Sequence, residues 1–418
     1  MFRSRLTFSR FGPLLRLFAM LTMAAGSPDA QAATSLQPSG PHAVGRRFET
    51  WRDDGRPDPV DPARRREVTV TIWYPAEGSS TPSAELPLPA PWNEARLSRL
   101  GKRFGGPFVD ALRAYHVSAR TDAPLLPGTT RFPVLLLMPG LGWLPTDYSG
   151  LAEDLASHGY VVVGFGSPGF ADLVRFPDGR EVERTLGIGA AIGTDQQHVH
   201  EDARFVTRRI PALDADSGSP LRGRLDLSRL GAVGHSLGGT MAHVLAASEP
   251  TIRSAVNLDG DPMGSVLEIR PTRPLLLISS ESPTIDEAPA FPSPEHRDRV
   301  REGLERSEGR RTDDWARMSS ASPAAFRIRV AGTRHLNFPD AALFEDLLTT
   351  PAERWMKVGQ IDGLRGLEIT RALVRAFFAH TLSSGDDAML QAPERFFPET
   401  RRERASVPSA VRPGADAR

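Results

Sequence analysis

The chain has 418 residues, of which 40% are hydrophobic and 24% charged, and its net charge is zero. This balance argues against nucleic-acid binding and against a strongly acidic partner. The sequence has no cysteine, which excludes a disulfide framework and a lipid anchor on a cysteine.

The amino end has the pattern of a secretory signal peptide. Arg3, Arg5 and Arg10 form a basic start, residues 14–26 are mostly apolar, and Ala-Gln-Ala at 30–32 matches a cleavage site. The apolar stretch is too short and too interrupted for a membrane span. We therefore expect an exported protein, either periplasmic or secreted.

The sequence predicts four segments. Residues 1–32 are the signal peptide, and the Pro-, Gly- and Arg-rich residues 33–65 form an extended arm. A globular domain covers 66–390 and carries an insertion at about 78–130. Residues 391–418 are rich in arginine, proline and alanine and are expected to be disordered.

Apolar and β-branched runs alternate with helical patterns along the globular domain. Strands are predicted at 68–74, 132–138, 160–165, 230–233, 254–258, 274–279 and 326–330. Helices are predicted at 147–158, 240–248 and 370–382. This alternation predicts an α/β fold with a mostly parallel central sheet and helices on both faces.

The insertion contains apolar residues at helical spacing between Leu97 and Tyr115, interrupted by Gly-Gly-Pro at 105–107. Basic side chains are distributed around this stripe. The pattern suits a lid with an apolar side over a pocket and a basic side for transient contact with a lipid surface. It equally suits a helix that packs on the sheet.

The motif Gly-His-Ser-Leu-Gly occupies residues 234–238, between a predicted strand and a predicted helix. This strand–turn–helix context is that of a nucleophile elbow, in which a sharp turn exposes the serine at the carboxyl edge of the sheet. The motif predicts an α/β-hydrolase fold with Ser236 as nucleophile.

A serine hydroxyl needs a neighbouring base, and in this fold the acid and then the histidine follow the serine along the chain. His335 lies on a loop after the strand at 326–330, at the edge where the base is needed. By contrast, His243 and His380 lie on predicted helices and His296 in a charged, proline-rich segment, so His335 is the predicted base.

Three carboxylates are candidates for the acid. Asp259 directly follows the strand at 254–258, Asp261 is two residues further on, and Glu281 follows the next strand. Each is also a normal loop or capping carboxylate, and strand position alone leaves the three open.

Pro-Gly-Leu-Gly at 139–142 leaves the strand at 132–138, where this fold places an oxyanion donor. The predicted donors are the backbone N–H groups of Leu141 and Leu237. The nearby Trp143 borders the substrate or packs in the core.

We predict no metal and no cofactor. His198 and His200 are two residues apart on a helical pattern and do not share a face.

The chain resembles the platelet-activating-factor acetylhydrolase family of the α/β-hydrolase superfamily, over about residues 45–383. The motifs that carry the resemblance are residues 72–76, 132–134, 139–142, 154–160, 234–238, 258–260 and 332–338. Carried over, the family's nucleophile, acid and base fall on Ser236, Asp259 and His335, and its oxyanion amides on Leu141 and Leu237. Pro139 departs from the family, which usually has histidine there.

The resemblance implies a secreted serine carboxylic-ester hydrolase that cleaves short-acyl esters or lipid esters through an acyl-enzyme, without a metal. One alternative keeps the three residues but acts on polyesters or bulky aromatic esters. Another is a non-catalytic binding protein with the same fold. The sequence leaves the oligomeric state open.

Overall fold

The computed structural model describes residues 36–78, 83, 85–89, 92–185, 194–262, 264–288, 291, 293–348 and 351–403. The predicted signal peptide and residues 404–418 of the predicted tail lie outside the described residues. Within them, no helix combines the length and the apolar content needed to cross a membrane.

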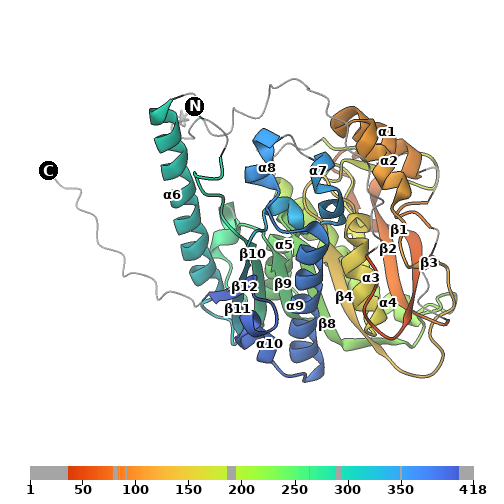
Figure 1. Cartoon of the computed structure of the whole chain (residues 1–418). Helices are drawn as coiled ribbons and strands as arrows, with labels where there is room; N and C mark the ends of the chain where they lie inside the picture. Colours follow the sequence, from red (N-terminus) through yellow and green to blue (C-terminus); the bar gives the residue numbers. More distant parts are fainter. Residues whose placement is uncertain are drawn as a thin grey trace, which may run out of the picture. The chain divides into compact units, whose positions relative to one another are not determined.

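Among the described residues, a ten-stranded sheet forms the centre of the fold (Figure 1). In spatial order the strands are β12 (Thr400–Glu403), β11 (Ala325–Val330), β10 (Leu275–Ser280), β9 (Ile252–Leu258), β8 (Leu225–His235), β4 (Phe132–Met138), β5 (Val161–Gly166), β2 (Arg65–Ala76), β1 (Ala43–Pro57) and β3 (Arg120–Thr121). The run from β11 to β5 is parallel, whereas β12 and β2 pair antiparallel with their neighbours. A separate hairpin pairs β6 (Leu173–Arg175) with β7 (Glu181–Glu183).

Helices cover both faces of this sheet. They are α1 (Trp92–Phe104), α2 (Gly106–Ala114), α3 (Ser149–Ser157), α4 (Thr194–Ala215), α5 (Leu237–Ser248), α6 (Pro294–Ser319), α7 (Glu345–Leu348), α8 (Pro351–Lys357), α9 (Gly363–Ser383) and α10 (Ala388–Gln391). The predicted α/β-hydrolase fold class, with a mostly parallel sheet between helices and an inserted helical segment, is confirmed.

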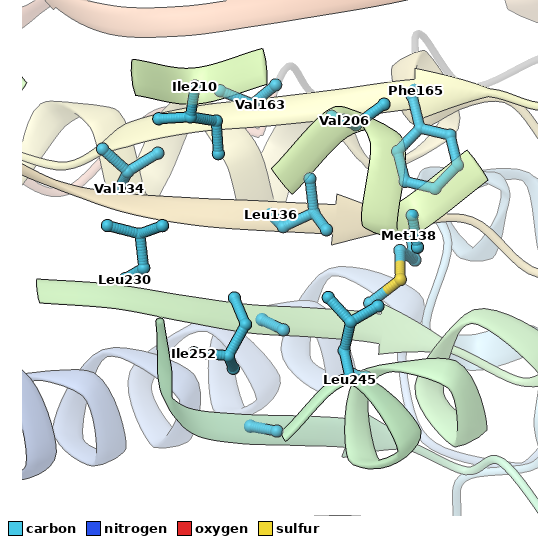
Figure 2. Packing of buried hydrophobic residues seen from close by; sticks show 14 of the residues in the cluster. Val134, Leu136, Met138, Val163, Phe165, Val206, Ile210, Leu230, Leu245 and Ile252 are labelled. Carbon is cyan, nitrogen blue, oxygen red and sulfur yellow. The ribbon is translucent and has the colours of Figure 1, made fainter. Parts of the chain in front are cut away.

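The two faces of β4 show how the core is divided. Val134, Leu136 and Met138 point to the cluster that also contains the apolar residues of α4 and α5 (Figure 2). Leu135 and Leu137 pack in a second cluster with α3 and α9. Because successive side chains of a strand point to opposite faces, a continuous apolar run is what a doubly covered strand requires.

Two predicted boundaries are wrong. Residues 43–57 of the predicted arm form β1, which pairs with β2 from Ala43 opposite Ala76 onwards. The buried charge of Arg46 on this strand is satisfied by Glu85 and by the carbonyl oxygens of Leu86 and Pro87. The predicted disordered tail is ordered up to residue 403, because β12 pairs with β11. Glu403 accepts from Arg329 Nε at 2.6 Å across this pair.

The insertion forms α1 and α2, and its apolar side packs against the chain. Phe108 and Tyr115 are buried with Phe344 and Leu348. Of the basic residues assigned to a lipid-facing side, Arg96 forms a two-bond ion pair with Asp147, at 2.6 and 2.7 Å. Arg99 pairs with Asp172 and Glu183, and Arg113 with Glu94.

Candidate active site

The serine of the motif lies on a sharp, strained turn between β8 and α5. Ser236 has φ 55° and ψ −123°, a conformation that non-glycine residues rarely adopt. A Cβ added at Gly234 would lie 2.3 Å from the carbonyl oxygen of Gly238, and one at Gly238 would lie 2.1 Å from that of Met138. Only glycine therefore fits at both positions, as a nucleophile elbow requires.

A chain of hydrogen bonds joins three of the predicted site residues. His335 Nε2 lies 2.9 Å from Ser236 Oγ, and His335 Nδ1 lies 2.8 Å from Asp259 Oδ2. Because an ionised Asp259 can only accept, Nδ1 carries the proton and Nε2 can accept the hydroxyl proton of Ser236. The three residues come from three segments: the ends of β8 and β9, and a short 3₁₀ turn (His335–Asn337) after β11.

Asp259 is buried and held in its ionised form. Its Oδ1 accepts from the backbone N–H and the hydroxyl of Ser280, both at 2.8 Å, and from Arg311 Nη2 at 2.5 Å. Burial opposes ionisation. However, the charge of Arg311 and the hydrogen bonds from His335 and Ser280 outweigh it, and they hold the pKa of Asp259 well below its ordinary value.

The other two candidate acids have different partners. Asp261 Oδ1 lies 2.7 Å from Arg311 Nε, and Glu281 Oε2 accepts from the backbone N–H of Gly332 at 2.9 Å. Among the described residues, neither carboxylate is hydrogen-bonded to His335. The geometry therefore favours Asp259 among the three.

The loop after β4 is fixed by its neighbours. Gly142 N–H donates to Phe170 O at 2.9 Å, and Trp143 N–H donates to Gly140 O at 3.0 Å. Within the described part of the chain, the N–H of Leu141 has no acceptor. Leu237 is the first residue of α5, where a backbone N–H has no partner inside the helix. Both predicted oxyanion donors are thus available to a ligand.

Sequence reasoning did not find two residues that support this site. Arg311 contacts Asp259 from α6, and nothing in the sequence pairs two positions so far apart. Tyr148 accepts the N–H of Gly140 at 3.1 Å and lies 2.8 Å from Nδ1 of His235. His235 stands inside the Gly-x-Ser-x-Gly motif, so its burial beside the serine could have been anticipated.

Trp143 lies close to the serine. Its Cδ1 and the Cβ of Ser236 are both within 3.3 Å of the point where a Cβ at Gly140 would lie. A small, mainly apolar cavity adjoins both candidate oxyanion residues and is lined in part by Trp143, Phe170 and Val199. The position is consistent with either of the two roles considered for Trp143, bordering the substrate or packing.

The histidines considered as metal ligands have other partners. His198 lies 3.8 Å from Glu201, and His200 Nε2 lies 2.9 Å from Ser248 Oγ. Asp202 is buried in an ion pair with Arg66. No group of three or more histidine, aspartate or glutamate side chains placed to hold a metal ion is found in the described residues.

Comparisons with known proteins find similar ester hydrolases. Residues 30–166 match the family model described as platelet-activating factor acetylhydrolase, isoform II, and this match ends before Ser236. A probable 1-alkyl-2-acetylglycerophosphocholine esterase of Arthroderma benhamiae is 24% identical over 87% of this chain and 92% of its own length.

Two further proteins extend the likeness. The platelet-activating factor acetylhydrolase of Canis lupus familiaris is 24% identical over 51% of this chain, which spans 54% of that relative. A solved ferulic acid esterase from Streptomyces cinnamoneus has a TM-score of 0.66 and 26% identity, covering 88% of this chain and 98% of that one. The chain is therefore similar to the platelet-activating-factor acetylhydrolases, has the α/β-hydrolase fold and is a carboxylic ester hydrolase.

Proposed function

We propose that this chain hydrolyses esters through a covalent acyl-enzyme on Ser236, with His335 as general base and Asp259 as the group that orients the imidazole. The observation that carries this proposal is the continuous hydrogen-bond chain from Ser236 Oγ through His335 to Asp259, at 2.9 and 2.8 Å. Both distances lie in the range required of a base and of the group that orients it.

In the first half of the reaction, Ser236 Oγ attacks the ester carbonyl carbon while His335 Nε2 takes its proton. The oxyanion of the tetrahedral intermediate accepts hydrogen bonds from the N–H groups of Leu141 and Leu237. When the carbon–oxygen bond to the alcohol breaks, His335 returns the proton to that oxygen. Asp259 stabilises the imidazolium while it exists and stays ionised.

In the second half, a water molecule attacks the acyl-enzyme and His335 accepts its proton. The second tetrahedral intermediate releases the acid and restores Ser236. Each step uses only side chains and amides of this chain, so the proposed mechanism needs no metal ion or cofactor.

The proposed substrates are short-acyl esters, including lipid esters. Support comes from the small apolar cavity beside Leu141 and Leu237, and from the likeness to a probable 1-alkyl-2-acetylglycerophosphocholine esterase. A second candidate, an ester with a bulky aromatic acid, is favoured by the likeness to a ferulic acid esterase. Rates with p-nitrophenyl esters of increasing acyl length and with methyl ferulate separate the two.

We also propose that the protein is exported to the periplasm or beyond. The basic start, apolar stretch and Ala-Gln-Ala site of residues 1–32 support this. Finding the mature amino terminus near residue 33 in an exported fraction would test it.

The proposed mechanism is tested by labelling with a fluorophosphonate, which reacts only with an activated serine. Wild type and the matched control Ser282→Ala should be labelled and hydrolyse p-nitrophenyl acetate. Ser236→Ala should fold with an unchanged melting temperature, remain unlabelled and lose activity by at least about 10³-fold. Unaltered turnover by the folded Ser236→Ala variant would overturn the assignment.

A further inference from the structure

One guanidinium connects the site to the long helix α6. Arg311 Nη2 lies 2.5 Å from Asp259 Oδ1, and Arg311 Nε lies 2.7 Å from Asp261 Oδ1. The Arg311 side chain is only 17% exposed. Burial opposes its charge, but the two carboxylates outweigh burial and raise the pKa of Arg311 above its ordinary value.

The two oxygens of Asp259 have different surroundings. Oδ2 accepts one hydrogen bond, from His335, whereas Oδ1 accepts three, two from Ser280 and one from Arg311. These donors fix the carboxylate plane and so the direction in which the imidazole points. Because Ser280 alone still provides two donors, loss of Arg311 should change the charge at this position more than the orientation.

We propose that Arg311 is a positioning residue of the site, whose positive charge weakens the electrostatic attraction of Asp259 for the protonated form of His335. This inference rests on the proposed function, in which His335 is the base that must be neutral before each turnover.

The argument is electrostatic. An aspartate beside the imidazole stabilises the imidazolium, and a positive charge at ion-pair distance from that aspartate offsets part of this stabilisation. Arg311 therefore reduces the stabilisation that Asp259 gives to the imidazolium form of His335. Asp261 acts in the opposite direction, because it takes up part of the charge of Arg311.

Other charged or titratable groups also surround His335, and they must be considered. They are His235 at the end of β8, Asp261 after β9, Glu281 after β10 and Arg334 next to it in the chain. Burial lowers the pKa of His235 to about 3, so that ring is neutral. Arg334 lies 2.6 Å from Glu287 and 3.8 Å from Glu281. This cation is therefore paired and does not substitute for Arg311.

The test compares Arg311→Gln, Arg311→Lys and Asp261→Asn in the full-length protein. The readout is kcat/KM for p-nitrophenyl acetate between about pH 5 and 9. For Arg311→Gln, we expect the acid limb of the profile to move to higher pH by about half a unit or more. For Asp261→Asn, where Arg311 acts on Asp259 alone, the limb should move to lower pH.

Arg311→Lys keeps the positive charge, but a lysine cannot bind Asp259 and Asp261 with two separate nitrogens as Arg311 does. Its pH profile should therefore lie between those of wild type and Arg311→Gln. The control is Arg310→Gln, on the same helix and exposed, which should leave the profile unchanged. KM should vary less than about twofold in all four variants, because none of them is expected to touch the substrate.

Equal loss of activity at every pH in Arg311→Gln, with an unmoved acid limb, would overturn the inference and leave Arg311 a purely structural role. If Arg311→Gln fails to fold, the opposite shifts expected of Arg311→Lys and Asp261→Asn decide the matter. Activity retained by Ser236→Ala would instead reject the proposed function, independently of these profiles.

Discussion

The Nε2 atom of His235 lies 2.9 Å from the backbone carbonyl oxygen of His335. A carbonyl can only accept, so Nε2 of His235 carries the proton and its Nδ1 accepts from the hydroxyl of Tyr148. The same hydroxyl oxygen accepts the N–H of Gly140. One buried chain of hydrogen bonds thus links the candidate oxyanion loop, the elbow and the loop of the candidate base.

Tyr148→Phe removes the central hydroxyl of this chain. We expect kcat for p-nitrophenyl acetate to fall by about tenfold, less than the 10²–10³ typical of losing an oxyanion donor, because the donors remain but are less well fixed. KM should change little. The matched control is Tyr160→Phe, a tyrosine with a buried ring that precedes β5. An unchanged kcat in Tyr148→Phe would contradict a role for the chain in catalysis.

The three candidate acids can be ranked by kinetics. Asp259→Asn should lower kcat by a factor on the order of 10⁴, since an asparagine favours the wrong imidazole tautomer. Asp261→Asn and Glu281→Gln should lose less than about tenfold at the pH optimum, because neither residue is hydrogen-bonded to His335. If Glu281→Gln is inactive while Asp259→Asn remains active, the catalytic acid is Glu281, after β10, and the assignment of Asp259 is wrong.

The helices of the insertion, α1 and α2, act either as a lid or as packed helices of the fold, and a substitution can distinguish the two. Phe108 is 2% exposed, and its ring centroid lies 6.2 Å from that of Phe344. We therefore expect Phe108→Ala to cost about 3–5 kcal/mol of stability. Hydrolysis of short and of long esters should fall together. Melting temperature and both rates are to be measured beside Lys102→Gln, an exposed control on α1. Selective loss of long-ester hydrolysis at unchanged melting temperature would favour a lid.

Asp340 should make stability fall with rising pH. Burial raises its pKa to about 8, so the folded state binds this proton more tightly than the unfolded state. The contribution of this proton to the free energy of unfolding is fully present below about pH 4 and is lost as the pH rises through about 8. Asp340→Asn should therefore gain stability relative to wild type between about pH 5 and 9, on the order of a few kcal/mol.

Chemical denaturation of wild type and Asp340→Asn at about pH 5 and about pH 9 measures this difference in stability. Glu153, whose pKa burial raises to about 7, acts in the same direction in both proteins, and its charge also helps to raise the pKa of Asp340. A constant difference between variant and wild type would show that Asp340 is not protonated in the folded state.

The parallel strands could be predicted because burial on two faces demands continuous apolar runs. The run at 132–138 matches β4 residue for residue. Strands β1 and β12 could not be predicted in this way, because their charged residues are paired with residues distant in the sequence. Arg46 is paired with Glu85, and Glu403 with Arg329. Helix α6 was also missed, because its polar sequence reads as a charged loop.

In the candidate site, too, some residues could be predicted from the sequence and others depend on contacts between distant segments. Ser236 and His335 could be proposed from the motif and from strand ends, because parallel strands bring their carboxyl ends to one edge of the sheet. The choice of Asp259 over Asp261 and Glu281 needed either the resemblance or the geometry. Arg311 required the packing of α6, which no local pattern encodes.

The short strand β12 also affects how the protein behaves in concentrated solution. Unpaired strand edges can recruit a second chain, and charged residues on a short edge strand oppose this. β12 covers β11 with four residues, of which Arg401 is exposed, and the opposite border of the sheet ends in the two-residue β3. β3 pairs only with Gly45 and Arg46, and the rest of β1 at this border is rich in charged residues, so neither border is an apolar template for aggregation. Truncation before residue 400 would uncover β11 and should make self-association depend on protein concentration.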